Sequence, residues 1–137
     1  MEKIVSYDSS LDQANKRLKA ISLSDNIPVL LAWSNDESYD TIFSNQLKNF
    51  LEKDDVVIGI SGSGNSKNVL NAIQLANEKH TTTIGLNGKG GGKLSEMVKI
   101  NLTVKSDDML TIETIHLLIC HLLTTMIRSD GTPKFNY

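Results

Sequence analysis

The chain has 137 residues, enough for one domain around a single hydrophobic core. Its formal net charge is −2 and its lysines and arginines form no extended cluster, so nucleic acid is not an expected partner. We expect no membrane helix, because such a helix needs ~18 apolar residues. We expect no internal disulfide, because Cys120 is the only cysteine. A cytoplasmic protein is therefore predicted.

The first third of the chain predicts short elements. A strand is expected at residues 4–7 and a polar helix at 11–20. Pro28 suits the first turn of a helix at 28–33, which the polar residues 34–36 end. Apolar residues at helical spacing then predict a helix at 39–51.

Residues 55–79 are the most informative stretch. The apolar run at 56–60 is typical of a strand buried on both faces of a parallel sheet. Every residue at 61–66 is then Ser, Gly or Asn, and apolar residues at helical spacing follow as far as residue 79. The pattern predicts a strand, a short polar loop and the N-terminus of a helix.

That loop has the composition of a phosphate site. The first turn of a helix has unpaired N–H groups and the positive end of the dipole, which favour an anion. Gly62 and Gly64 let the backbone approach a ligand, and Ser61, Ser63 and Ser66 add hydroxyl donors. A phosphate monoester is the simplest ligand for these groups.

Other interpretations of the loop fit less well. A dinucleotide-binding fingerprint needs a glycine where Lys67 stands, and a nucleophile elbow needs one where Ser63 stands. An ordinary strand-to-helix turn capped by Asn65 or Ser66 remains possible, but it does not explain the three serines.

Two further strands are expected after this helix. The first covers 81–86 and should be parallel to its predecessor, because a helix connects them. The glycine-rich loop at 87–93 does not bind a nucleotide, since Leu94 stands where Ser or Thr is needed; it is either a flexible connection or a loop over the ligand. The last strand covers 99–104, with Ile100, Leu102 and Val104 on one face.

The longest predicted helix covers 109–128, and the acidic residues of 106–108 lie at its positive end. It is apolar nearly all round, and Cys120 is interpreted as one of its packing residues. Burying such a helix in so small a protein usually takes a partner subunit. We therefore expect a homodimer or homotetramer that uses this helix.

Glu113, His116 and His121 interrupt the apolar surface of that helix. At 100° per residue, His116 and His121 lie on either side of Glu113, about 60° and 80° away. The three side chains share one arc and are candidates for one site. The alternative for each histidine is a hydrogen-bonded core residue.

Several short sequence motifs of this chain occur in the same order in one known family. They are Ser24-Asp-Asn26, Ser34-Asn-Asp36, Tyr39-Asp-Thr-Ile-Phe-Ser-Asn-Gln46, Gly59-Ile-Ser-Gly-Ser-Gly-Asn-Ser66, Gly88 to Lys93, and Glu113-Thr-Ile-His116 with His121. By these motifs, residues 21–128 resemble the sugar isomerase (SIS) domain and, within it, the phosphoheptose isomerases.

The resemblance implies roles for individual residues. Those implied to hold the phosphate of a seven-carbon ketose phosphate are Ser61, Gly62, Ser63, Gly64, Asn65 and Ser66. His121 stands at the family's catalytic histidine, and Glu113 at a glutamine that contributes to a metal site in some members. Asn26 and His116 are implied as substrate contacts. The resemblance implies no required cofactor; zinc, held by Glu113 and His121, is the one candidate. The negative charge of Glu113 would strengthen metal binding or raise the basicity of His121.

The chain departs from the family at positions that bear on catalysis. Gly62 stands where this branch usually has Thr. Asn15 and Lys19 stand where the family has a His and the Glu that acts as general base, and a lysine cannot replace a carboxylate. We therefore expect a trimmed or fragmentary member, divergent or truncated over its first ~20 residues, or one that has lost catalysis.

The predicted fold is a single α/β domain over 1–137, a three-layer α/β/α sandwich with a mainly parallel, flavodoxin-like sheet. The resemblance implies conversion of sedoheptulose 7-phosphate through an enediol to glycero-manno-heptose 7-phosphate, a precursor of lipopolysaccharide. The alternatives are a non-catalytic phosphosugar-binding, regulatory or protein-interaction module and, less favoured, a structural oligomerisation domain.

Overall fold

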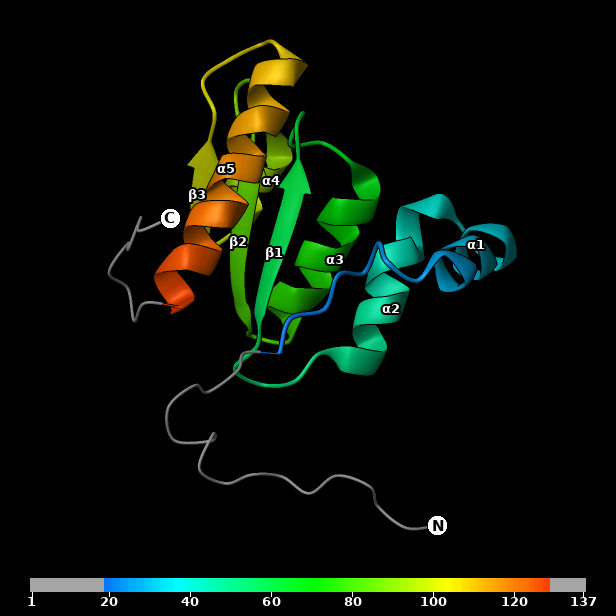
Figure 1. Ribbon diagram of the computed structural model, residues 1–137. Coiled ribbons are helices and arrows are strands. Elements are labelled where there is room, and N and C mark those ends of the chain that lie inside the picture. Colours follow the sequence, from blue (N-terminus) through cyan, green and yellow to red (C-terminus); the bar gives the residue numbers. More distant parts are fainter. Residues whose placement is uncertain (1–18, 129–137) are drawn as a thin grey trace, which may run out of the picture.

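The computed structural model describes residues 19–128, which form three layers (Figure 1). The elements in chain order are α1 (Ile27–Asp36), the 3-10 turn η1 (Tyr39–Thr41), α2 (Ile42–Phe50), β1 (Val56–Ser61), α3 (Lys67–Glu78), β2 (Thr82–Asn87), α4 (Gly92–Met97), β3 (Ile100–Thr103) and α5 (Met109–Arg128). The strand predicted at 4–7 and most of the helix predicted at 11–20 lie outside the described residues.

The described strands form one parallel sheet in the order β1-β2-β3. Its register places Ile58, Ile84 and Ile100 side by side, so equivalent residues of the three strands point to the same face. In Figure 1, α5 lies on one face, while α3 and α4, the two crossover helices, lie on the other, with α1 and α2 beyond α3. The predicted three-layer parallel fold is confirmed.

The face under α3 and α4 is closely packed. A Cβ on Gly59 would lie 3.0 Å from Val69 Cγ1, and one on Gly85 would lie 3.0 Å from Val98 Cγ2. Glycine at these two strand positions therefore lets the covering chain approach the sheet backbone. Ile73 and Ala76 of α3 are 0% exposed as a result.

The face under α5 is covered only along its middle. Leu86 of β2 and Ile112 of α5 are both 0% exposed. On β1, however, Val56, Ile58 and Ile60 are 56%, 46% and 47% exposed. The prediction that this strand is buried on both faces was therefore wrong for the described part of the chain, because α5 covers β2 and leaves these β1 side chains about half exposed.

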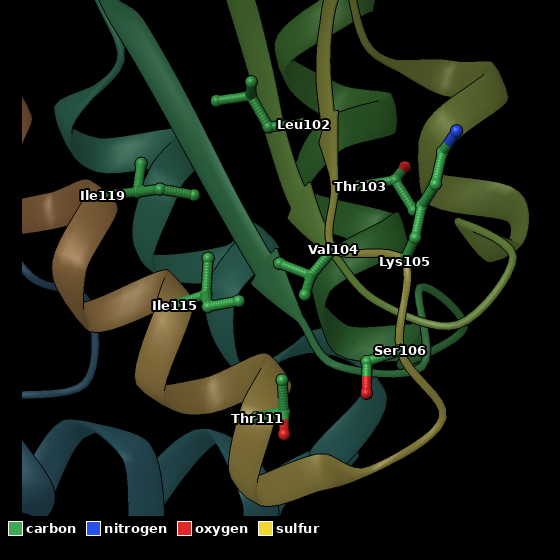
Figure 2. A pocket seen from close by; sticks show the side chains of 8 residues that line it. All are labelled: Leu102, Thr103, Val104, Lys105, Ser106, Thr111, Ile115 and Ile119. Carbon is green, nitrogen blue, oxygen red and sulfur yellow. The ribbon is translucent and has the colours of Figure 1, made fainter.

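The other flank of this face is also open. Ile100 and Leu102 of β3 are 49% and 40% exposed, and of the three apolar residues predicted to share a face only Val104 is buried. Between β3 and α5 lies an apolar groove of about 300 Å³ (Figure 2). Its lining side chains include Leu102, Val104, Ile115 and Ile119.

Helix α5 begins and ends where the sequence predicts. The Asp108 carboxylate accepts hydrogen bonds from the backbone N–H and the hydroxyl of Thr111, at 2.8 and 2.6 Å. The helix is not buried all round, since the outward side chains of Leu110 and Leu117 are 76% and 61% exposed. By length and composition alone, Met109–Ile127 passes the test for a membrane span, so the expectation that no segment would do so was wrong. A mostly buried core helix passes the same test, whereas 11% of this window is buried.

Candidate functional site

The polar groups of the candidate site lie at the carboxyl edge of the sheet. The strands β1, β2 and β3 end at Ser61, Asn87 and Thr103, and parallel pairing brings these ends to one edge. The start of α5 packs on the same edge, because a Cβ on Gly62 would overlap Met109. In open parallel sheets, ligands bind at this edge.

The serine loop, residues 61–66, is held by its own hydroxyl groups. The hydroxyls of Ser61 and Ser66 are 2.9 Å apart, and Ser63 Oγ accepts the backbone N–H of Asn65 at 3.2 Å. Ser61 is buried, at 5% exposed, whereas Ser66 is exposed. Two of the three predicted phosphate hydroxyls therefore bond to each other across the loop.

The helix that follows is not capped by its own N-cap side chain. Ser66 is the N-cap of α3, and its hydroxyl makes no bond to the first turn. Two N–H groups of this turn have acceptors within the chain, since Val69 N–H donates to Asn68 Oδ1 at 2.9 Å and Leu70 N–H donates to Ser66 O at 3.0 Å. The N–H groups of Lys67 and Asn68, for which the described residues show no acceptor, are the ones open to an anion.

The glycine-rich loop is packed against the serine loop. The N–H groups of Gly88 and Leu94 donate to the carbonyl oxygens of Gly62 and Gly64, at 3.0 and 2.9 Å. Gly64 has φ +67°, and a side chain there would overlap Gly91. Of the two predicted alternatives, the described bonds do not fit a flexible connection; the loop is a second wall beside the serine loop.

Asn65 joins the same two loops through its side chain. Its Oδ1 accepts the backbone N–H of Lys93 at 3.1 Å, and its Nδ2 donates to Ser63 O at 3.0 Å. Lys93 lies in α4, a helix that was not predicted because the glycines before it mask the helical pattern. Asn65 is therefore a structural bridge as well as a predicted phosphate residue.

His116 is a buried residue, 4% exposed, on the sheet side of α5. Its Nε2 lies 3.1 Å from the carbonyl oxygen of Asn87. A carbonyl can only accept, so this geometry assigns the proton to Nε2. His116 thus ties α5 to the end of β2, which is the hydrogen-bonded alternative considered above; the substrate-contact role implied by the resemblance remains a prediction.

Asn87 is a site residue that the sequence analysis missed. It is 0% exposed, its Nδ2 donates to Asn101 Oδ1 at 2.6 Å, and its Oδ1 accepts from Thr103 Oγ1 at 2.6 Å. The available signal was an amide residue directly after the apolar run of a strand and directly before glycines.

The structure does not bring Glu113, His116 and His121 together within one chain. Glu113 and His121 are exposed, and His116 faces the sheet. Glu113 and His121 are also eight residues apart, about 12 Å along the helix axis. Among the described residues, no group of three or more His, Cys, Asp and Glu side chains is placed to hold a metal ion.

Asn26 lies apart from the serine loop. Its Oδ1 accepts the N–H of Val29 at 3.3 Å, so it is the N-cap of α1. It lines a cavity of about 620 Å³ between residues 20–29 and α2, and none of the cavity's lining residues belongs to the serine loop. Its substrate role would need a second site or a second chain.

This arrangement, a parallel sheet with a serine loop at the N-terminus of α3, is that of an α/β domain with a candidate ligand site at the carboxyl edge of its sheet. The SIS domain family matches residues 34–125, and the chain belongs to this family.

Phosphoheptose isomerases are among the proteins similar in sequence to this chain. The chain is 43% identical over 115 residues to the one from Helicobacter hepaticus, covering 84% of this chain and 59% of that protein. It is 41% identical over 113 residues to the one from Aliarcobacter butzleri, covering 82% and 60%. The chain therefore spans less than two thirds of the length of these relatives.

Solved structures agree with the sequence comparison. The phosphoheptose isomerase GmhA from Neisseria gonorrhoeae has a TM-score of 0.77 and 35% identity, over 80% of this chain and 61% of that one. A phosphoheptose isomerase from Francisella tularensis has a TM-score of 0.80 and 32% identity, over 85% and 63%.

Proposed function

We propose that the serine loop binds the phosphate group of a sugar phosphate, and that the chain is the phosphosugar-binding domain of a phosphoheptose isomerase. The observation that carries the proposal is the serine loop at the carboxyl edge of the sheet, followed by a helix whose N-cap residue, Ser66, makes no side-chain bond to the first turn. The names of the similar proteins support sedoheptulose 7-phosphate as the ligand.

Calorimetry with sedoheptulose 7-phosphate and with sedoheptulose tests the binding proposal. We expect the phosphate ester alone to bind. Ser61→Ala combined with Ser63→Ala should weaken binding by roughly 1–3 kcal/mol, through the loss of charge-assisted hydrogen bonds. Ser44→Ala is the matched control, because Ser44 is also buried but donates to Thr41 O in a different part of the chain. Equal binding of the ester and the free sugar would contradict the proposal.

The proposed reaction moves a proton between the first two carbons of the sugar through an enediol. It needs a base within hydrogen-bond reach of the substrate carbon. Glu113 and His121 are the candidates, and both lie on the exposed surface of α5. An assay of sedoheptulose 7-phosphate conversion, with Glu113→Ala and His121→Ala as variants, tests them. Turnover lost in either variant would support the pair; no turnover in the wild type would favour the non-catalytic binding module.

We also propose assembly into a homodimer or homotetramer through α5. The outward side chains of Leu110, Leu117 and Leu118 are 76%, 61% and 55% exposed, more apolar surface than a single soluble helix usually leaves in water. Such an assembly would set Glu113 and His121 at the boundary between copies. Sedimentation of the wild type and of Leu117→Glu tests it: we expect a dimer or larger for the first and a smaller species for the second.

We propose zinc as a candidate metal at Glu113 and His121. Zinc at Glu113 and His121 would need further ligands, because zinc sites use three or four protein groups. Activity unchanged by a chelator would remove zinc from the proposal.

We propose a cytoplasmic location, where a phosphorylated sugar would be available as substrate. Recovery of the protein only in the membrane fraction would contradict that location.

A further inference from the structure

Lys67 is the first residue of α3, directly after the serine loop. A lysine there puts a positive charge at the positive end of the helix dipole, which is unfavourable for the helix itself. The first turn of α3 has no acidic residue to offset this charge. The helix terminus proposed to meet the phosphate therefore carries a cation that does not serve the helix.

The partner of Lys67 in the described chain is Asp40. Lys67 Nζ lies 3.4 Å from Asp40 Oδ2, and the two side chains are 76% and 44% exposed. An ion pair this exposed is weak, since water and salt screen it. A stronger anion near the start of α3 would compete effectively for the lysine.

Asp40 is held in place by bonds that do not involve Lys67. Its N–H donates to Ser38 Oγ at 3.1 Å, and its carbonyl oxygen accepts from Asn71 Nδ2 at 2.8 Å. Asn71 belongs to α3, so Asp40 stays close to this helix whether or not the ion pair is formed. The long side chain of Lys67 is the partner that is free to turn.

We propose that Lys67 leaves Asp40 and pairs with the phosphate group when the ligand binds, so that Asp40 competes with the ligand for the lysine. This inference rests on the phosphate site proposed at residues 61–66. A phosphate monoester has a charge of about −1.5 to −2 at neutral pH, against −1 for a carboxylate. The exchange therefore selects dianionic phosphate esters over ligands with a single negative charge.

Titration calorimetry with sedoheptulose 7-phosphate tests the exchange in four variants. We expect Lys67→Gln to weaken binding about tenfold, through loss of a charge-assisted contact. Asp40→Asn should strengthen binding about threefold, because it releases the lysine from a weak pair. The double variant should bind like Lys67→Gln. Lys79→Gln, at the other end of α3, is the matched control and should bind like the wild type.

Each contrary result has its own meaning. Equal affinity of Lys67→Gln and the wild type would overturn the inference while leaving the phosphate site intact. Weaker binding by Asp40→Asn would also overturn it, because the pair would then act as one structural unit. A wild type that does not distinguish sedoheptulose 7-phosphate from sedoheptulose would instead remove the proposed function.

Discussion

The face of the sheet with smaller and more polar residues is the more deeply buried one, and the face with larger apolar residues is the more exposed. The face under α3 and α4 has small or polar residues such as Gly59, Thr83 and Gly85, and all three are buried. The face under α5 has larger apolar residues such as Ile58 and Ile60, which are 46% and 47% exposed. Small side chains let helices approach closely, and close approach removes water.

This difference shows what a strand's composition can and cannot predict. Apolar residues indicate which face is suited to burial, but an adjacent helix covers only the width over which it lies. One helix of diameter about 10 Å covers roughly two strands spaced about 4.8 Å apart. A three-stranded sheet under α5 alone therefore keeps an open margin.

The largest expected effect on stability is at the face of the sheet under α3 and α4. Ile73→Ala should destabilise the fold by about 2–5 kcal/mol, because Ile73 is 0% exposed and its removal leaves a cavity against Gly59. Urea unfolding followed by circular dichroism measures the loss. A loss below about 1 kcal/mol would mean that the close packing of α3 does not govern stability.

The next effect is at the part of the α5 face that is covered. His116→Ala should cost about 1–3 kcal/mol, because it leaves a carbonyl of Asn87 with one partner fewer and opens space beneath α5. His121→Ala is the control on the exposed side of the same helix and should change unfolding by less than about 0.5 kcal/mol. Equal losses in the two variants would contradict the assigned faces of α5.

A smaller effect is expected at the open margin. Ile58→Ala should cost about 1 kcal/mol in the monomer, since nearly half of the side chain is already in water. The measurement is repeated at low and high protein concentration. A loss that grows with concentration would show that a second copy covers this margin, because association stabilises the folded state by mass action.

The smallest effect is electrostatic and depends on pH. The hydroxyl and the backbone N–H of Thr111 donate to Asp108 and lower the pKa of its carboxyl. Because the pKa is lower in the folded state, the Asp108 carboxylate stabilises the fold at pH values above the ordinary aspartate pKa. This stabilisation is lost as the pH falls through the pKa of the folded state. Thermal unfolding of Asp108→Asn should therefore depend less on acid than that of the wild type. Asp107→Asn is the neighbouring control, and an identical acid response of all three proteins would contradict the prediction.

The sequence predicts most of what local chemistry controls. The strand, serine loop and helix at 55–79, the parallel pairing of β1 with β2 and the bounds of the final helix all follow from periodicity and turn residues. These features depend on neighbours in the chain, so a single sequence contains their signal.

The remaining features depend on residues far apart in the chain. The bond between His116 and Asn87 joins positions 29 residues apart, and neither residue type alone indicates the other. The exposure of Ile58 depends on where α5 lies, which no local pattern specifies. For the site, the sequence indicated the serine loop and, from the pattern of the last helix, Glu113, whereas the resemblance supplied Asn26. The described chain leaves Asn26 and Glu113 outside that loop.

The bridge from Asn65 to Lys93 has a consequence for solvent exchange. The amide proton of Lys93 bonds to a side chain of the serine loop, whereas Leu94 next to it bonds to a backbone carbonyl of the same loop. Removing the Asn65 amide group should therefore speed deuterium uptake at Lys93 while Leu94 keeps its acceptor. One pair of adjacent amides thus reports separately on the side-chain and backbone contacts between the two walls.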